Sequence, residues 1–172
     1  NFSKAPKGKI PYIDDGGELL GDSTLIRWHI EKKYGVNFDQ GLTSEQRAAA
    51  WAFEKMAEDN LYWGIVHTRW MDEANFDKGP RVFFKAAPAI IRPFFVAMIR
   101  RQIRKTLHSQ GLGRHSATEI AELESRSLQA IPDYLGSKPF FMGDEPTGAD
   151  ATMFAFVASA MCPVFRSPLQ QA

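Results

Sequence analysis

The fold of this chain is decided by Gly8-Lys9-Ile10-Pro11-Tyr12-Ile13 and by the later stretch Gly21-Asp22-Ser23-Thr24-Leu25-Ile26. Proline lacks an amide hydrogen, so Pro11 belongs at the end of a strand or on an edge strand, and it is a candidate for a cis peptide bond. The segment Asp14-Asp15-Gly16-Gly17 predicts a hairpin turn between two short strands, 12–13 and 18–20. A helix is expected to open at Asp22-Ser23, because apolar residues follow at helical spacing.

The start of this helix has two interpretations. The first amides of a helix lack intrahelical partners and lie at the positive end of the helix dipole, so they form a natural site for a carboxylate. Beside a strand edge, such a site suits the capture of an extended peptide. Alternatively, Asp22 and Ser23 are only helix caps, which stabilise a helix by roughly 1 kcal/mol without any ligand.

Composition limits the class of protein. Of the 172 residues, 44% are hydrophobic and 24% are charged, which is ordinary for a soluble protein of one or two domains. The formal net charge of +1 argues against a general nucleic-acid binder. A single cysteine, Cys162, excludes an intrachain disulfide and fits a reducing compartment, so we expect a cytoplasmic location. The four histidines are scattered, and no Cys/His spacing predicts a metal site.

Beyond about residue 38 the strand signals end and the chain is expected to be helical. A capping sequence at 42–46 opens a long helix to about Met71, and residues 75–80 are expected to break it. A second helical stretch runs from 81 to about 107, with a kink or break near its two prolines. Ser116-Ala117-Thr118-Glu119 predicts a capping box, and further helices are expected at about 116–135 and 147–161. The expected fold class is therefore α+β.

The apolar stretch 86–99 is too short to span a membrane and contains Arg92 and two prolines, whereas a spanning helix needs roughly 20 mostly apolar residues. We expect a buried helix or a surface that packs against a partner. The cations that follow at 100–105 are interpreted as a solvated helix face rather than a site for lipid or nucleic acid.

Two blocks resemble the glutathione transferase family. Residues 9–13 with 22–26 resemble the second half of its thioredoxin-like domain. Residues 140–151, Phe-Phe-Met-Gly-Asp-Glu-Pro-Thr-Gly-Ala-Asp-Ala, resemble the family's FFxGDxPTxAD sequence before a core helix. The resemblance implies a partial thioredoxin-like domain at 1–38 and the all-helical transferase C-terminal domain at 42–172. For Thr147 and Asp150 we expect a structural role, because they form a capping-box pattern before an apolar run.

The resemblance also implies a site for glutathione as co-substrate. In this family the residue before a cis-proline pairs its backbone with the cysteinyl part of glutathione, and an acidic residue followed by Ser binds the γ-glutamyl end. These roles fall on Ile10 and Pro11, with Lys9 beside them, and on Asp22 and Ser23. The opening strand, helix and second strand of the domain are not found here. The Tyr, Ser or Cys that contacts the glutathione sulfur is therefore expected outside this sequence, and no catalytic residue is assigned.

The loop Gly111-Leu112-Gly113-Arg114-His115-Ser116 narrows the resemblance to the branch that includes failed-axon-connections and metaxin-like proteins. We expect a structural role for this loop, with a positive φ after a helix end. A second-substrate pocket is expected on the first long helix, where aromatic surface and polar tips combine at Tyr62, His67, Arg69 and Trp70. The alternative is that the tryptophans of this helix are core residues and that His67 and Arg69 pair with acidic neighbours.

Two functions of different class remain open. In the first, a homodimeric enzyme binds glutathione and conjugates or otherwise transforms a small hydrophobic electrophile. In the second, a non-catalytic transferase-like scaffold, similar to metaxins, binds another protein through its helical domain. Neither function involves nucleic acid or a membrane-spanning segment.

Overall fold

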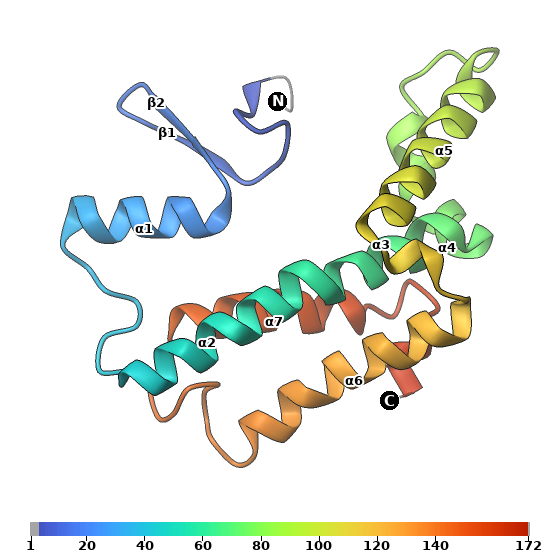
Figure 1. The fold of residues 1–172 in the computed structure, drawn as a ribbon. Helices are drawn as coiled ribbons and strands as arrows, with labels where there is room; N and C mark the ends of the chain where they lie inside the picture. Colours follow the sequence, from blue (N-terminus) through green and yellow to red (C-terminus); the bar gives the residue numbers. More distant parts are fainter. Residues whose placement is uncertain (1–3, 172) are drawn as a thin grey trace. The chain divides into compact units, whose positions relative to one another are not determined.

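The computed structural model describes residues 4–171, and its contacts divide the chain into an N-terminal unit, Asn1–Gly41, and a helical unit, Leu42–Ala172. The N-terminal unit contains a two-stranded sheet and a helix, and the described part of the helical unit is built mainly of helices (Figure 1). This arrangement confirms the predicted α+β fold class. Among the described residues, no helix combines the length and apolarity needed to cross a bilayer.

The sheet is an antiparallel hairpin of β1, Tyr12–Asp15, and β2, Glu18–Gly21, in which Tyr12 lies opposite Gly21. The two glycines of the turn have positive φ, as the hairpin signal requires. The Ile10–Pro11 peptide bond is cis, which confirms the sequence-based prediction.

Helix α1, Ser23–Tyr34, is tied to this hairpin by Asp15. The carboxylate of Asp15 accepts a bond from Lys33 Nζ at 2.6 Å, and its other oxygen lies 2.6 Å from His29 Nε2. The bond to Lys33, followed by that to His29, holds the pKa of Asp15 below its usual value. The N-terminal unit therefore fixes the position of α1 relative to β1 and β2 by polar contacts as well as by packing.

The long first helix of the helical unit has three parts: α2, Ser44–Met56, a π-helical segment, Ala57–Leu61, and α3, Tyr62–Met71. Thr43 and Gln46 form the capping box at its start, with reciprocal bonds of 3.1 Å and 2.8 Å. The π-helical segment was not predicted, because no Gly or Pro marks it.

The next part of the chain corrects one sequence-based expectation and confirms another. The expected break at 75–80 contains most of a short helix, α4, Glu73–Lys78, which Asp72 caps by accepting the Asn75 amide at 2.8 Å. A 3₁₀ helix, Pro80–Phe84, follows it, and α5 covers only Arg92–Gln110. The helical stretch is therefore broken near Pro88 and Pro93, as predicted, and Pro93 lies in the first turn of α5, where proline costs no hydrogen bond. Of the two alternatives for the stretch 86–99, a buried helix is wrong, because Ile90 and Phe94 are exposed, and a surface that packs against a partner stays a prediction.

The helical unit closes with α6, Ala117–Leu135, and α7, Gly148–Ala160, followed by a 3₁₀ helix, Pro168–Gln171. The predicted capping box of Ser116 and Glu119 opens α6. Gly111 has a φ of 120° after α5, and Arg114 Nε donates to the His108 carbonyl oxygen at 3.0 Å. The loop between α5 and α6 thus has the predicted structural role.

The core of the helical unit forms where α2, the π-helical segment and α7 meet. It contains the fully buried Leu61 and Ala149 together with Phe141, Met142 and Met153. The ring of Phe53 lies 4.9 Å from that of Phe141, edge to face, and 4.7 Å from that of Tyr134. Phe141 and Met142, which precede α7 in the sequence, are therefore part of the core.

The carboxylate of Asp150 fixes the start of α7. One oxygen accepts the Phe141 amide at 2.6 Å, and the other accepts the amide and the hydroxyl of Thr147 at 2.8 Å and 2.9 Å. Buried amide groups cost free energy when they lack a partner, so this carboxylate satisfies donors that cannot reach water. The structural role predicted for Thr147 and Asp150 is confirmed.

Replacing Asp150 with Ala is expected to lower the free energy of unfolding by about 1–3 kcal/mol, because two amides lose their acceptor in the core. Chemical unfolding of wild type and variant measures this difference. Asp144→Ala is the matched control, since Asp144 is exposed in the same loop and should change stability by less than about 0.5 kcal/mol. Equal unfolding midpoints for the two variants would contradict the structural role.

Candidate functional site

The two stretches predicted to bind glutathione lie together in the N-terminal unit. The Asp22 amide donates to the Pro11 carbonyl oxygen at 3.3 Å, and the neighbouring pair Tyr12 and Gly21 is in register in the sheet. The backbone that follows Ile10 is therefore in direct contact with the start of α1. Lys9 and Ile10 are both exposed, so the strand edge at this point is open to solvent.

The surroundings of Asp22 are compatible with both roles considered from the sequence, that of a helix cap and that of a ligand-binding residue. Its Oδ1 accepts the amides of Thr24 and Leu25 at 3.1 Å and 3.2 Å, so it caps α1. Its φ of 90° and ψ of 125° are rare for a residue other than glycine. Backbone strain of this kind costs roughly 1–3 kcal/mol and clusters at ligand sites. Capping alone does not require it, because Thr43 and Ser116 cap their helices with extended backbone.

Ser23 is the first residue of α1, and its side chain is exposed beside the capping residue. The Ser23 hydroxyl and the Ser23 amide, which the Asp22 side chain does not bind, can both donate to one carboxylate. The positive end of the helix dipole favours the same negative group. This corner of the N-terminal unit can therefore hold the carboxylate end of an extended ligand.

The four residues predicted to line a second-substrate pocket have different surroundings. Tyr62 packs edge to face on Trp63 at 5.0 Å, and Trp70 lies 5.8 Å from the ring of Phe76. Arg69 donates from Nη2 to the carbonyl and hydroxyl oxygens of Ser159, at 2.8 Å and 2.9 Å. Its guanidinium also lies over the ring of Phe165. Arg69 thus joins α3 to α7 and the segment after it, and its polar atoms are bonded to the protein rather than to an acidic neighbour.

His67, by contrast, lines a cavity of about 300 Å³ between α3, α4 and α6. Burial lowers the pKa of His67, so its imidazole is neutral at pH 7. Glu124 of α6 lines the same cavity, and Asp72 and Arg166 add further polar groups. Asn75 is fully buried beside it and is occupied by bonds to the Arg166 backbone and the Thr68 carbonyl.

Glu124 is the residue that the sequence analysis missed. Only 3% of the surface of Glu124 is exposed, and within the described part of the chain its Oε2 has no hydrogen-bond partner. The carboxyl group lies against Gly64, where any Cβ would be only 2.2 Å from its carbon. Burial raises the pKa of Glu124 to about 7. The sequence signal was present, because Glu124 interrupts the apolar face formed by Ile120, Leu128 and Ile131.

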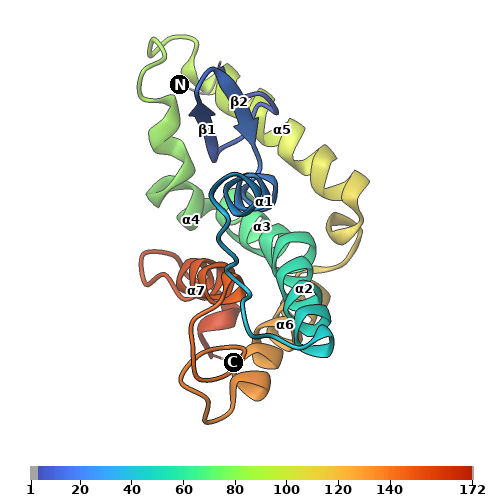
Figure 2. The ribbon, with the colours of Figure 1, turned by 90° about the vertical axis from the view of Figure 1, so that its left-hand side faces the viewer.

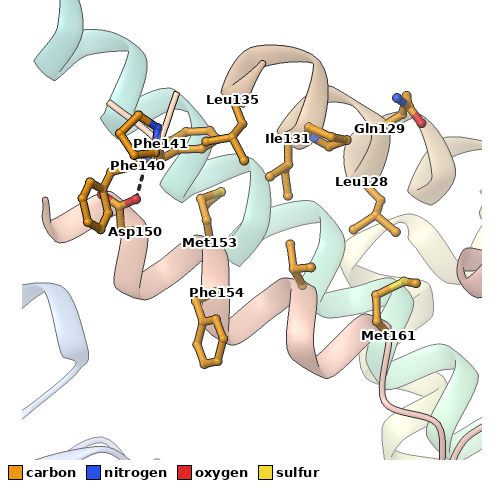
Figure 3. Close-up of a pocket in the computed structure, with 13 residues that line it drawn as sticks. Leu128, Gln129, Ile131, Leu135, Phe140, Phe141, Asp150, Met153, Phe154 and Met161 are labelled. Carbon is orange, nitrogen blue, oxygen red and sulfur yellow. Dashed lines mark hydrogen bonds between the residues drawn. The ribbon is translucent and has the colours of Figure 1, made fainter. Parts of the chain in front are cut away.

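A second cavity, of about 420 Å³, lies between α6 and α7 (Figure 3). Met153 and Met161 face Leu128, Ile131 and Leu135 across it, whereas Phe154 points away. Asp150 is its acidic residue, and that carboxylate is already bonded to Phe141 and Thr147. The lining is mostly apolar and suits an apolar molecule, and Gln129 adds an amide whose nitrogen donates to Asp133.

Comparison with known proteins gives two matching family models. The model described as the glutathione S-transferase N-terminal domain matches residues 1–75, and that of the glutathione S-transferase C-terminal domain matches residues 125–172. Together they cover most of the chain. The first extends beyond the N-terminal unit into α2 and α3.

Three curated relatives illustrate the range of similar proteins. The chain is 34% identical over 156 residues to the isoprene-epoxide–glutathione S-transferase of Rhodococcus sp. (strain AD45), a match that covers 88% of this chain and 65% of the relative. It is 36% identical to Failed axon connections of Drosophila melanogaster, covering 90% and 39%. It is 30% identical to human metaxin-1, covering 90% and 35%. The chain thus spans between about one third and two thirds of the length of these relatives.

The buried Glu124 predicts a dependence of stability on pH. Its pKa is about 7 in the folded protein and close to 4.5 when unfolded, so the folded state binds the proton more tightly. Its stabilising contribution is therefore complete below pH 4.5 and is lost as pH rises through 7, by roughly 2–4 kcal/mol. The lowered pKa of His67 acts in the opposite direction, so only a comparison of variants isolates the effect of Glu124.

Glu124→Gln should remove this loss, which is measured as the difference in unfolding free energy between pH 5 and pH 8. Glu122→Gln is the matched control on the same helix, because Glu122 is exposed and pairs with Arg126. The control should keep the wild-type difference. An unchanged difference in Glu124→Gln would show that Glu124 is ionised without cost in the folded protein.

Proposed function

Because the chain belongs to the glutathione S-transferase-like superfamily, we propose that it binds glutathione at the corner between Pro11 and the start of α1. The observation that carries the proposal is the bond between the Pro11 carbonyl and the Asp22 amide, which joins the two stretches named from the sequence. The backbone of Ile10, beside Lys9, would pair with the cysteinyl part of the ligand. The hydroxyl and the amide of Ser23 would hold its γ-glutamyl carboxylate, and Asp22 its ammonium group.

The proposed activity is conjugation or another transformation of a small hydrophobic electrophile by the bound thiol. The similarity to an isoprene-epoxide–glutathione S-transferase supports an epoxide as the test substrate. Binding the peptide in an extended form would hold its sulfur at one place, and a lowered thiol pKa would increase the reactive thiolate. Of the residues proposed to contact the second substrate, His67 lines a cavity, whereas Arg69 is bonded to Ser159.

A second candidate is a non-catalytic scaffold that binds another protein, either as a homodimer or with a different partner. The similarity to Failed axon connections and metaxin-1 supports it. The scaffold makes no use of the corner at Asp22, so the backbone strain at this residue favours the glutathione-binding proposal. Glutathione binding by the intact protein separates the two candidates.

Isothermal titration of the intact protein with glutathione is expected to show binding, and Ser23→Ala should weaken it by about 10- to 100-fold. Losing one hydrogen bond to a charged ligand group costs roughly 1.5–3 kcal/mol. Ser44→Ala is the matched control, because Ser44 is also the exposed first residue of a helix that follows a capping residue. Absence of binding by the wild type would overturn the proposal and favour the scaffold.

Asp22→Asn tests the ligand role of Asp22 apart from its capping role. Asparagine caps helices about as well as aspartate and tolerates positive φ, so the unfolding free energy should change by less than about 0.5 kcal/mol. The loss of the negative charge facing the ligand ammonium should weaken glutathione binding by roughly 10-fold. Unchanged affinity with unchanged stability would restrict Asp22 to its capping role.

A further inference from the structure

Charge is strongly segregated along this chain. Residues 78–118 contain nine lysine and arginine residues and no aspartate or glutamate. The whole chain has 21 basic and 20 acidic residues, so the remainder is acidic on balance. The net charge of +1 conceals this segregation, and the segment coincides with one substructure, the 3₁₀ helix Pro80–Phe84 and α5.

The same segment exposes large apolar side chains on the 3₁₀ helix, in the turn that follows it and in the first half of α5. We call Val82, Phe83, Ile90, Phe94 and Met98 the apolar tip; Phe83 is 77% exposed, Ile90 94% and Phe94 69%. Exposed apolar side chains that cluster in this way mark an interaction surface, because water around them is unfavourable. Both views of the fold show α5 projecting away from α6 and α7 (Figures 1 and 2).

Helix α5 presents two residues of the apolar tip and the cations on one exposed stripe. Phe94, Met98, Arg101 and Lys105 follow one another at spacings of three and four residues and are all exposed. Arg101, Arg104 and Lys105 surround a shallow depression with His108 and Ser109. None of these three cations takes part in the ion pairs of the described residues, whereas Arg81 and Arg100 pair with Glu73 near the base of the segment. The stripe thus changes from apolar to basic along the helix.

The sequence alone favoured a solvated face for the cations at 100–105, but the exposed apolar residues beside them change this interpretation. We propose that the segment 80–110 docks on an anionic lipid surface, with the apolar tip inserted and the basic part of the stripe among the headgroups. Phe94 and Lys105 are about 16 Å apart along the helix, from a rise of 1.5 Å per residue. With the tip buried about 5–10 Å deep, Arg101 and Arg104 would lie at the headgroup layer or within a Debye length of it. Neighbouring apolar and basic surfaces are what an interfacial segment requires, and each cation near an anionic leaflet strengthens binding.

Other occupants fit the surface less well. A nucleic acid would pair with the cations but has no counterpart for exposed Phe83, Ile90 and Phe94. A second copy would cover the apolar tip but would leave the unpaired cations beside it without a use, unless its acidic part faced them. A lipid surface satisfies both halves of the stripe at once. This inference does not depend on the proposed glutathione site, which lies in the other unit.

The test is co-sedimentation of the intact protein with phosphatidylcholine vesicles that contain or lack phosphatidylserine, at low and high salt. Wild type is expected to bind the anionic vesicles at least about 10-fold more tightly than the neutral ones, and added salt should weaken this binding. Equal binding to both vesicles, or no binding to either, would overturn the proposal.

Two variants locate the surface. Phe83→Ser with Phe94→Ser removes the tip, and Arg101→Gln with Arg104→Gln and Lys105→Gln removes the basic part. Each is expected to lower anionic-vesicle binding by about 10- to 100-fold, because each variant removes two or three groups that would contact the lipid. Phe154→Ser on α7 and Arg126→Gln on α6 are matched controls, because these side chains are similarly exposed outside the segment.

Vesicle binding that both variants retain would assign it to another surface and overturn the proposal. Light scattering identifies the second copy as occupant: an oligomer that the tip variant dissociates, and that vesicles do not compete with, would also overturn it. Tighter binding of the wild type to RNA than to anionic vesicles, lost in the basic variant but kept in the tip variant, would do the same.

Discussion

The helical unit depends on the three hydrogen bonds accepted by the carboxylate of Asp150. Helix α7 is apolar along most of its length, so its first amides cannot be left to water without exposing the core. By bonding both the helix start and the Phe141 amide, Asp150 fixes the angle at which the chain enters α7. Phe141 is thereby held against Phe53 and Tyr134, and the cavity between α6 and α7 has its wall. The Asp150 carboxylate thus links the conformation of the loop before α7 to the packing of the core.

Two aspartates at helix starts show how environment separates roles that look alike in sequence. Asp150 is partly buried and forms a capping box with Thr147. Both of its carboxylate oxygens accept hydrogen bonds from backbone amides. Asp22 is exposed, uses Oδ1 for two amides and sits in a backbone conformation that aspartate rarely adopts. Solvent access at Asp22, together with the neighbouring Pro11 backbone, leaves room for a ligand that Asp150 does not have. This difference is the physical basis for assigning stability to one and ligand binding to the other.

Two other features lower stability without an evident structural benefit. Glu124 places a carboxyl group between α3 and α6 where its Oε2 has no partner among the described residues, and the apolar tip leaves aromatic side chains in water. Natural proteins are expected to lose such features unless function retains them, because each lowers the free energy of unfolding. They lie in different parts of the helical unit. The first makes folding sensitive to protons near pH 7, and the second supplies a surface for a partner.

Local signals in the sequence determined the hairpin, the cis-proline stretch and the starts of α1, α2, α6 and α7, because turns and caps act over three or four residues. The resemblance carried by residues 9–26 and 140–151 determined the superfamily. Only the tertiary structure decided that Arg69 bonds to Ser159, that Glu124 is buried against Gly64 and that the tip of α5 stays exposed. The reason is physical: burial depends on which helix faces meet, and the residues that meet in these contacts are far apart in the chain. A local period cannot distinguish an apolar face that finds a partner from one that does not.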